Sequence, residues 1–160
     1  MAVSHAANSG TFKVTTPADR EIVLTRLFDA PPQVVFEAMT KPEHVRRWWG
    51  ADVLCEIDLR PGGAWHFVGR SPQGDVGFHG VYREIDPPGR LVYTESFDPF
   101  PGDSLVTQVL TEEDGKTRMT LTCVYPSRDV RDMVIKSGME RGAALCYDRL
   151  EEVVAEMQGN

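Results

Sequence analysis

The stretch "VGFHGVYREIDPPGRLVYTESF", residues 76–97, decides the fold of this chain, because two runs rich in β-forming residues flank a turn sequence. The turn "DPPG", residues 86–89, combines two prolines with a glycine, and these residues interrupt regular structure and favour tight turns. Two such runs joined by so short a connection predict an antiparallel β-hairpin. The hairpin in turn predicts an antiparallel sheet around it.

Strand-like runs continue on both sides of this hairpin. Four more of them lie at residues 53–59, 64–70, 104–113 and 117–125. Turn sequences rich in glycine, proline and aspartate, such as "RPGG" and "EDG", separate the runs. Connections this short join neighbouring antiparallel strands, so the six runs predict a six-stranded meander.

Upstream of the meander, the sequence predicts one further strand and a helix. Residues 20–28 ("REIVLTRLF") alternate as a strand, which places Arg26 on the same face as two apolar residues. In the next segment, residues 29–39, Asp29 is positioned to cap a helix whose first turn contains two prolines.

A second short helix follows at once. Thr40 and Glu43 have the spacing of a capping box, and Gly50 is positioned to end the helix in the left-handed conformation. The adjacent Trp48 and Trp49 would point about 100° apart on such a helix, so we expect them to have different roles. One is predicted to pack under the first helix, and the other to approach the long C-terminal helix or the mouth of a cavity beneath it.

After Pro126 the apolar pattern predicts one long amphipathic helix of about 30 residues with Ser127 as its N-cap. At about 1.5 Å per residue, this helix would be about 45 Å long and could cross a small sheet. Gly138 and Gly142 lie on or near its inner face, although a glycine inside a helix costs up to about 1 kcal/mol. They indicate either close approach of the helix to the sheet or space left above a cavity.

The order of elements, β-α-α-β6-α, predicts an α+β domain. A curved antiparallel sheet wrapped around the long C-terminal helix would bury the apolar faces of both, with the two short helices at one end. We expect this domain to span residues 19–158. Residues 1–18 are small and polar and are expected to form a flexible tail.

Composition limits the possible partners. The 17 basic and 24 acidic residues give a net charge of −7 without long charged blocks, which argues against nucleic acid or an anionic membrane as the main partner. The chain contains no apolar run of about 18 residues and no signal-peptide core, so we expect no membrane insertion and a cytoplasmic location. Three widely spaced cysteines indicate no disulfide framework. Metal-ligand and phosphate-loop motifs are absent, so no cofactor is expected.

Four motifs together carry a family resemblance: "FDAPPQVVFEAMTKPEHVRRWWG" (28–50), "DLRPGGAWHF" (58–67), "GVYREIDPPGRLVYTE" (80–95) and "SGMERGAALCYDRLEEVVAE" (137–156). Across nearly its whole length the chain resembles the Bet v 1-like helix-grip fold of the START-like, or SRPBCC, superfamily. Within that superfamily it looks like the family named after the activator of heat-shock protein 90 ATPase.

The resemblance implies a hydrophobic cavity between the sheet and the C-terminal helix. Members of the superfamily include lipid carriers, hormone receptors, polyketide cyclases and co-chaperones, so the fold does not settle the function. A tryptophan often follows the second glycine of the last motif in this family, whereas this chain has Ala143. That departure could enlarge the cavity.

The hairpin also suggests polar groups for the cavity. If "DPPG" closes it symmetrically, cross-strand pairing places His79, Arg83 and Glu95 on the buried face. Buried charges need partners, so Glu95 with Arg83 or His79 would form a recognition or acid–base cluster. The alternatives are a structural bond or a solvent-facing position, and a one-residue bulge in the strand before the turn would reverse its two faces.

The candidate cavity residues combine this cluster with aromatic side chains and with small residues of the long helix. They are Trp48, Trp49, Trp65, Phe67, His79, Arg83, Tyr93, Glu95, Phe97, Gly138, Gly142 and Cys146. For the aromatic residues, core packing is the alternative to lining a ligand cavity.

Two classes of function follow. The first is a non-catalytic domain that binds a small hydrophobic molecule in the cavity, with a cyclase or hydrolase using the same cavity as a variant of it. The second, which the family name implies, is a co-chaperone module with heat-shock protein 90 as its partner.

Overall fold

The structure is a computed structural model, and it describes residues 8–97 and 102–159. An eight-stranded antiparallel sheet has the order β1-β2-β8-β7-β6-β5-β4-β3. The strands are β1 (Lys13–Thr15), β2 (Glu21–Phe28), β3 (Leu54–Ile57), β4 (Ala64–Ser71), β5 (Gly74–Asp86), β6 (Arg90–Phe97), β7 (Ser104–Glu113) and β8 (Lys116–Val124). The helices are a short 3-10 helix (Ser9–Thr11), α1 (Pro32–Thr40), α2 (Pro42–Trp48), α3 (Arg128–Lys136) and α4 (Met139–Met157).

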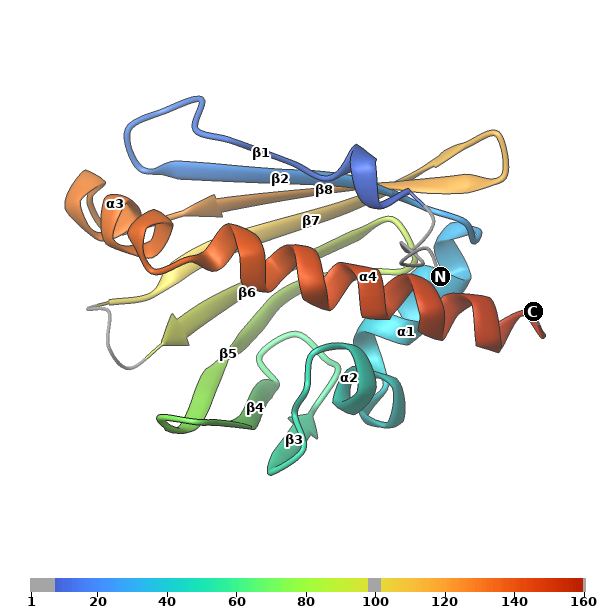
Figure 1. The fold of residues 1–160 in the computed structure, drawn as a ribbon, viewed down its shortest axis with the longest axis horizontal. Coiled ribbons are helices and arrows are strands. Elements are labelled where there is room, and N and C mark those ends of the chain that lie inside the picture. The colour runs from blue at the N-terminus through green and yellow to red at the C-terminus, as the bar shows by residue number, and fades with distance from the viewer. Residues whose placement is uncertain (1–7, 98–101, 160) are drawn as a thin grey trace, which may run out of the picture.

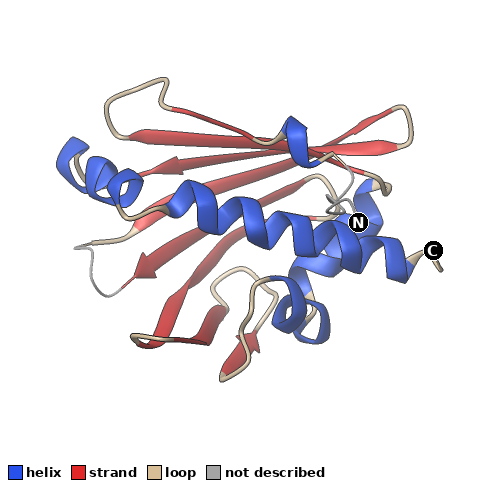
Figure 2. Cartoon of the chain, viewed as in Figure 1, coloured by secondary structure: helices blue, strands red, loops and turns tan. Residues whose placement is uncertain are grey.

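The sheet curves around α4, which runs across its concave face, while α1 and α2 lie at one end (Figure 1). Strands β3 to β8 follow one another in the sheet in sequence order, so the predicted six-stranded meander is confirmed. Strand β2 then adds to the outer side of β8. The predicted α+β class and the helix-grip architecture are therefore confirmed, as the separation of helices and strands in Figure 2 also shows.

Strand β2 has the alternation that its sequence predicts. Every second residue of it, from Ile22 to Phe28, is buried, while the residues between them are partly exposed. Arg26 lies on the buried face and has no exposed surface. A charged residue in this position requires partners inside the molecule.

The segment before β2 differs from the flexible tail predicted for residues 1–18. Residues 13–15 form β1 and pair with β2, with Val14 opposite Leu24. The 3-10 helix precedes this strand, and the Thr11 hydroxyl accepts a hydrogen bond from the main-chain N–H of Leu27 at 3.0 Å. The sequence did not reveal this edge strand, because only Val14 of its three residues is apolar. Pairing with β2 and the packing of Val14 against the core hold it in place. Residues 1–7 lie outside the described residues.

The caps of the two short helices also differ from prediction. The N-cap of α1 is Pro31, and Asp29 instead forms an ion pair with Lys116 at 3.1 Å. The Thr40 hydroxyl donates to the Phe36 carbonyl within α1, so the predicted capping box does not form. The sequence predicted both helices correctly. Their predicted caps do not form, because Asp29 and Thr40 bond to other groups instead.

The C-terminal helical segment is divided into two helices, not one as predicted. Ser127 is the N-cap of α3 and accepts a hydrogen bond from Val130, as expected. Between α3 and α4, Gly138 adopts the left-handed conformation with φ 87°. A glycine takes this conformation without steric cost, so the chain changes direction here.

The end of α2, the cysteines and the hydropathy of the helices agree with the sequence expectations where the structure describes them. Gly50 has φ 85° directly after α2, as predicted for a helix end. All three cysteines are free, and Cys55 and Cys123 are buried. Within residues 8–97 and 102–159, no helix has both the length and the apolar character needed to cross a bilayer.

Candidate functional site

A bulge in β5 decides which residues face α4. Next to the turn, Ile85 lies opposite Leu91, as the symmetric hairpin predicts. The register then shifts between Tyr82 and Glu84, so that Tyr82 lies opposite Tyr93. This is the one-residue bulge considered above, and it reverses the two faces of β5 from that point onward.

Gly80 marks a second irregularity of β5, because residues 80 and 81, between His79 and Tyr82, have no partner in the ladder with β6. A Cβ at this position would lie 1.7 Å from the carbonyl oxygen of Thr94, so β5 approaches β6 too closely for any side chain. The next residue, Val81, donates its N–H to the Thr94 hydroxyl at 2.9 Å instead of joining the regular ladder. Glycine and threonine together therefore stabilise the local irregularity.

The bulge places His79 and Arg83 on the outer face of the sheet, where both are exposed. The predicted cluster of Glu95 with Arg83 or His79 is therefore wrong. Phe78 and Tyr82 face the concave side in their place. The sequence contained a signal for this orientation of β5, because Phe78, Gly80 and Tyr82 are uncharged residues at alternate positions and so share one face of the strand.

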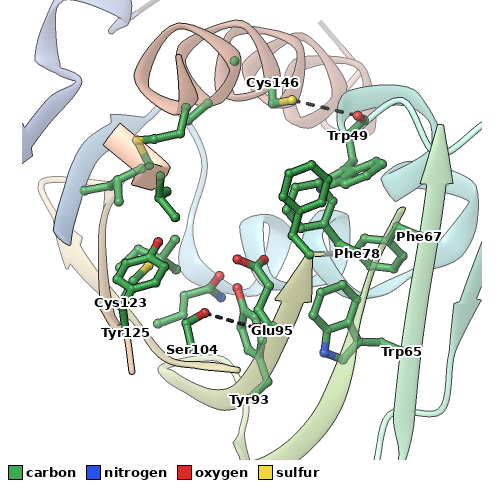
Figure 3. Close-up of a pocket in the computed structure, with 18 of the residues that line it drawn as sticks. Trp49, Trp65, Phe67, Phe78, Tyr93, Glu95, Ser104, Cys123, Tyr125 and Cys146 are labelled. Carbon is green, nitrogen blue, oxygen red and sulfur yellow. Dashed lines mark hydrogen bonds between the residues drawn. The ribbon is translucent and has the colours of Figure 1, made fainter. Parts of the chain in front are cut away.

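A cavity of about 500 Å³ lies between the concave face of the sheet and α4 (Figure 3). It is lined mainly by aromatic and aliphatic side chains. Ten of the twelve residues proposed from the sequence line it: Trp48, Trp49, Trp65, Phe67, Tyr93, Glu95, Phe97, Gly138, Gly142 and Cys146. A Cβ built on Gly142 would meet no atom within 4 Å, which favours the cavity explanation for this glycine over close packing.

Sequence reasoning missed further residues of the cavity wall. They include Phe78, Tyr82, Ser104, Gln108, Tyr125 and Tyr147. Tyr147 was recognisable in principle, because it follows Ala143 by four residues on α4 and so lies on the same face. Ser104 and Gln108 gave no comparable signal, since buried polar residues in a strand resemble solvent-facing ones in sequence.

Aromatic rings in contact form one side of the cavity. The Phe67 ring lies 4.8 Å from that of Trp65 and 5.5 Å from that of Trp49, measured between ring centroids. Trp49 also meets Phe78 edge-on at 5.3 Å, and Phe78 stacks on Phe97 at 4.5 Å. Such edge-to-face and stacked pairs hold the wall in a defined shape.

The two adjacent tryptophans have different roles, as their angular offset predicts. The Trp48 indole N–H donates to the carbonyl of Ala38 in α1 at 2.9 Å, so this ring packs under the first helix. Trp49 turns its ring toward Phe67, and its carbonyl accepts a weak bond from the Cys146 thiol of α4 at 3.9 Å. The pair thus joins α1, α2 and α4 around one end of the cavity.

Glu95 is the charged group of this site. It extends from β6 into the cavity, between the aromatic wall and the side that carries Cys123 and Tyr125 (Figure 3). The Ser104 hydroxyl bonds to the main-chain carbonyl of Glu95 at 3.2 Å and not to its carboxyl. Among the described residues, none forms a hydrogen bond or an ion pair with that carboxyl.

Burial raises the pKa of Glu95 from 4.5 to about 7. The neighbouring Cys123, Tyr93 and Tyr147 also have raised pKa values, first because of burial and then because of nearby negative groups such as Glu95. These thiol and phenol groups therefore stay uncharged at neutral pH, where Glu95 changes between its two forms. The site can accept or donate a proton and can hydrogen-bond to a molecule in the cavity.

No set of histidine, cysteine, aspartate or glutamate residues in the described part of the chain is arranged to hold a metal ion. His66 and His79 lie side by side on the outer face, with ring centroids 5.9 Å apart. The cavity itself contains neither of them.

Comparison with known proteins agrees with this architecture. The family model described as "Activator of Hsp90 ATPase homolog 1-like protein" matches residues 29–155. No curated protein matches the chain by sequence.

Solved structures similar to this one span most of the chain. A protein from Rhodobacter sphaeroides has 26% identity and a TM-score of 0.84, and the match covers 91% of this chain and 99% of the other. Protein Ms6760 from Mycobacterium smegmatis has 23% identity and a TM-score of 0.81, over 91% of this chain and 98% of the other. An HSP90 activator from Plasmodium falciparum has 25% identity and a TM-score of 0.56, over 67% of this chain and 74% of the other.

Proposed function

The chain belongs to the Activator of Hsp90 ATPase homolog 1-like family, and within that family we propose that it binds a small, largely apolar molecule between α4 and the sheet. The cavity of about 500 Å³ carries this proposal. Small-molecule sites occupy roughly 300–1,000 Å³ and combine apolar walls with a few polar groups that orient the ligand. Here the aromatic wall would provide the contact area and Glu95 the orienting group.

Binding without turnover fits the chemistry of the cavity better than covalent catalysis. Burial raises the pKa of the Cys123 and Cys146 thiols, so neither is a thiolate nucleophile at neutral pH. Glu95 alone could transfer a proton, but no second catalytic group among the described residues contacts its carboxyl. The cyclase or hydrolase variant therefore has less support.

Ligand binding can be tested with the neutral fluorophore N-phenylnaphthylamine. We expect saturable fluorescence enhancement with the wild-type chain, and at least about tenfold weaker binding with Ala143→Trp, because the larger side chain would occupy the cavity that Ala143 lines. Leu145→Trp is the matched control, since Leu145 lies on the outer side of the same helix and is 53% exposed.

Thermal unfolding curves of Ala143→Trp and Leu145→Trp would check that both variants are folded. The proposal is wrong if the wild-type chain shows no saturable binding, or if Ala143→Trp binds the fluorophore as tightly as the control does.

A chaperone partner is the second candidate function, favoured by the family and by the similarity to the Plasmodium falciparum activator. The tryptophan pair does not provide an exposed surface for this role, because Trp48 is 7% exposed and Trp49 packs against Phe67 and Phe78. A chaperone would therefore have to contact another surface of the chain.

If this second function holds, adding the purified chain to a heat-shock protein 90 should raise its ATPase rate at least about twofold, which corresponds to a small change in activation free energy. The Ala143→Trp variant should stimulate equally, since its substitution lies inside the cavity. If the chain neither binds the heat-shock protein 90 nor changes its ATPase rate, this candidate function is excluded.

A further inference from the structure

The cavity wall has an unusual charge balance. Among the described residues that line it, Glu95 is the sole acidic residue, and no lysine, arginine or histidine is present. A ligand with a carboxylate, sulfate or phosphate would therefore bring a second negative charge into the cavity without meeting a cation. Two like charges in an apolar environment are strongly unfavourable. Anionic amphiphiles are thus poor ligands for this site.

The position of Glu95 indicates what the ligand should carry instead. Its carboxyl points into the cavity, and no described residue bonds to it. Glu95 is only partly buried, because the cavity leaves its carboxyl accessible to solvent, but a ligand that fills the cavity without offering a donor would leave this carboxyl buried and unpaired, at a cost in free energy. A ligand that donates a hydrogen bond to this carboxyl would avoid that cost. A cationic donor would gain most, because charge-assisted bonds are stronger than neutral ones.

Aromatic rings near Glu95 favour the same kind of ligand. Tyr93, two residues before Glu95 on β6, meets the Trp65 ring edge-on at 5.6 Å, and both rings line the cavity. The faces of tyrosine and tryptophan rings attract cations, and this attraction increases when the cation is removed from water. A carboxylate next to aromatic rings is therefore a suitable environment for an ammonium group.

We propose that the cavity takes a small amphiphilic amine, whose ammonium group pairs with the Glu95 carboxylate while its apolar part packs against Trp49, Phe67 and Phe78. This inference rests on the proposed ligand-binding function and specifies the chemical class of the ligand. Binding requires the ionised carboxyl, so a protonated Glu95 releases its proton to solvent as the protonated amine enters.

Other titratable groups of the cavity do not interfere with this proton release. Those that face the cavity with Glu95 are Tyr82, Tyr93, Cys123, Tyr125, Cys146 and Tyr147. Burial raises the pKa of each of these tyrosines and cysteines, so they stay protonated at neutral pH. Glu95, with a pKa of about 7, is the group that responds to pH in this range.

The test uses three probes that share a phenylbutyl chain and end in a primary amine, a hydroxyl or a carboxylate. We expect the wild-type chain to bind phenylbutylamine most tightly, phenylbutanol less tightly and phenylbutyrate most weakly. Glu95→Gln should weaken amine binding by about 10- to 100-fold and change alcohol binding by less than about threefold. Glu56→Gln, a carboxylate control on β3 outside the cavity, should leave all three affinities unchanged.

A second measurement needs no variant. Titration calorimetry of the wild-type chain with phenylbutylamine, in buffers of different ionisation enthalpy, should show release of nearly one proton at about pH 6 and far less at about pH 8. Phenylbutanol should release almost none at either pH.

The outcomes separate this inference from the function on which it rests. Binding of N-phenylnaphthylamine without a preference for phenylbutylamine over phenylbutanol overturns the amine inference and leaves ligand binding intact. An equal loss of amine and alcohol binding in Glu95→Gln, or absence of proton release with the amine, also overturns it. If neither the fluorophore nor any of the three probes binds, the proposed function itself fails.

Discussion

Replacing Arg26 with alanine is expected to lower the free energy of unfolding by about 3–5 kcal/mol, because it leaves buried acceptors without their cation. The Arg26 guanidinium has no exposed surface and contacts Asp148 at 2.8 Å and Glu151 at 3.2 Å, both on α4. It also donates to the carbonyl of Leu27 at 2.8 Å and lies 4.6 Å from the centroid of the Phe28 ring. One side chain of β2 thus connects the sheet to the helix that covers the cavity.

Glu151 explains why the effect should be large. Its carboxylate accepts bonds from Arg26, from the Asn8 side chain at 2.9 Å and from the main-chain N–H of Asp29 at 2.9 Å. It is 4% exposed, so loss of Arg26 would leave a buried negative charge held only by neutral donors. The start of the described chain, the end of β2 and α4 all meet at this carboxylate.

Urea denaturation of the wild-type chain and the variant would measure the change. Arg118→Ala is the control, because Arg118 forms an ion pair with Glu113 at 2.6 Å on the surface, where such pairs contribute about 0–1 kcal/mol. Equal losses in the two variants would show that the buried network does not stabilise the fold beyond a surface pair.

Glu95 gives the second large effect, which depends on pH. Its pKa is about 7 in the folded chain against an ordinary value of 4.5, so the folded state binds more protons than the unfolded state between these two values. Stability is therefore highest below the unfolded pKa and falls as pH rises through this window to the folded pKa. The shift corresponds to about 3 kcal/mol of lost stability above pH 7.

Glu95→Gln should remove this dependence, because an amide does not ionise. We expect the difference in unfolding free energy between the wild-type chain and the variant to change by about 3 kcal/mol from pH 4.5 to pH 8, in favour of the variant at the higher pH. Comparing the two proteins at each pH cancels the titration of all other groups. Denaturation across this range would measure the difference, with Glu56→Gln as an exposed control on β3.

A constant difference between the wild-type chain and Glu95→Gln across this pH range would contradict the prediction. It would mean that the Glu95 carboxyl titrates alike in the folded and unfolded states.

Local patterns in the sequence predicted most of the architecture. The alternation of 20–28 correctly placed Arg26 on one face with Ile22 and Leu24, and Gly50 correctly marked the end of α2. These features depend on residues close together in the chain, where main-chain periodicity and conformational preference dominate. Gly138 shows where local patterns stop being sufficient. Whether a glycine continues a helix or ends it, as here, depends on how the neighbouring elements pack.

The candidate site divides in the same way. By itself, the sequence determined that a hairpin forms at 76–97, and it suggested Trp65, Phe67 and Glu95 for a cavity, with core packing or a solvent-facing position as the alternatives. Only the tertiary structure decided that Phe78 faces the cavity and His79 faces solvent. One extra residue in β5 between Tyr82 and Glu84 shifts its register with β6, and a shift of one residue turns every side chain beyond it to the opposite face of the sheet.

The partner of each buried charge was likewise decided by the tertiary structure. Arg26 meets Glu151, 125 residues away, whereas Glu95 meets no cation among the described residues. Pairing across such separations depends on how α4 lies over the sheet, and no local pattern in the sequence encodes it. For that reason the sequence suggested Glu95 as one possible polar cavity residue but could not supply its surroundings, and the suggested partners Arg83 and His79 lie on the outer face.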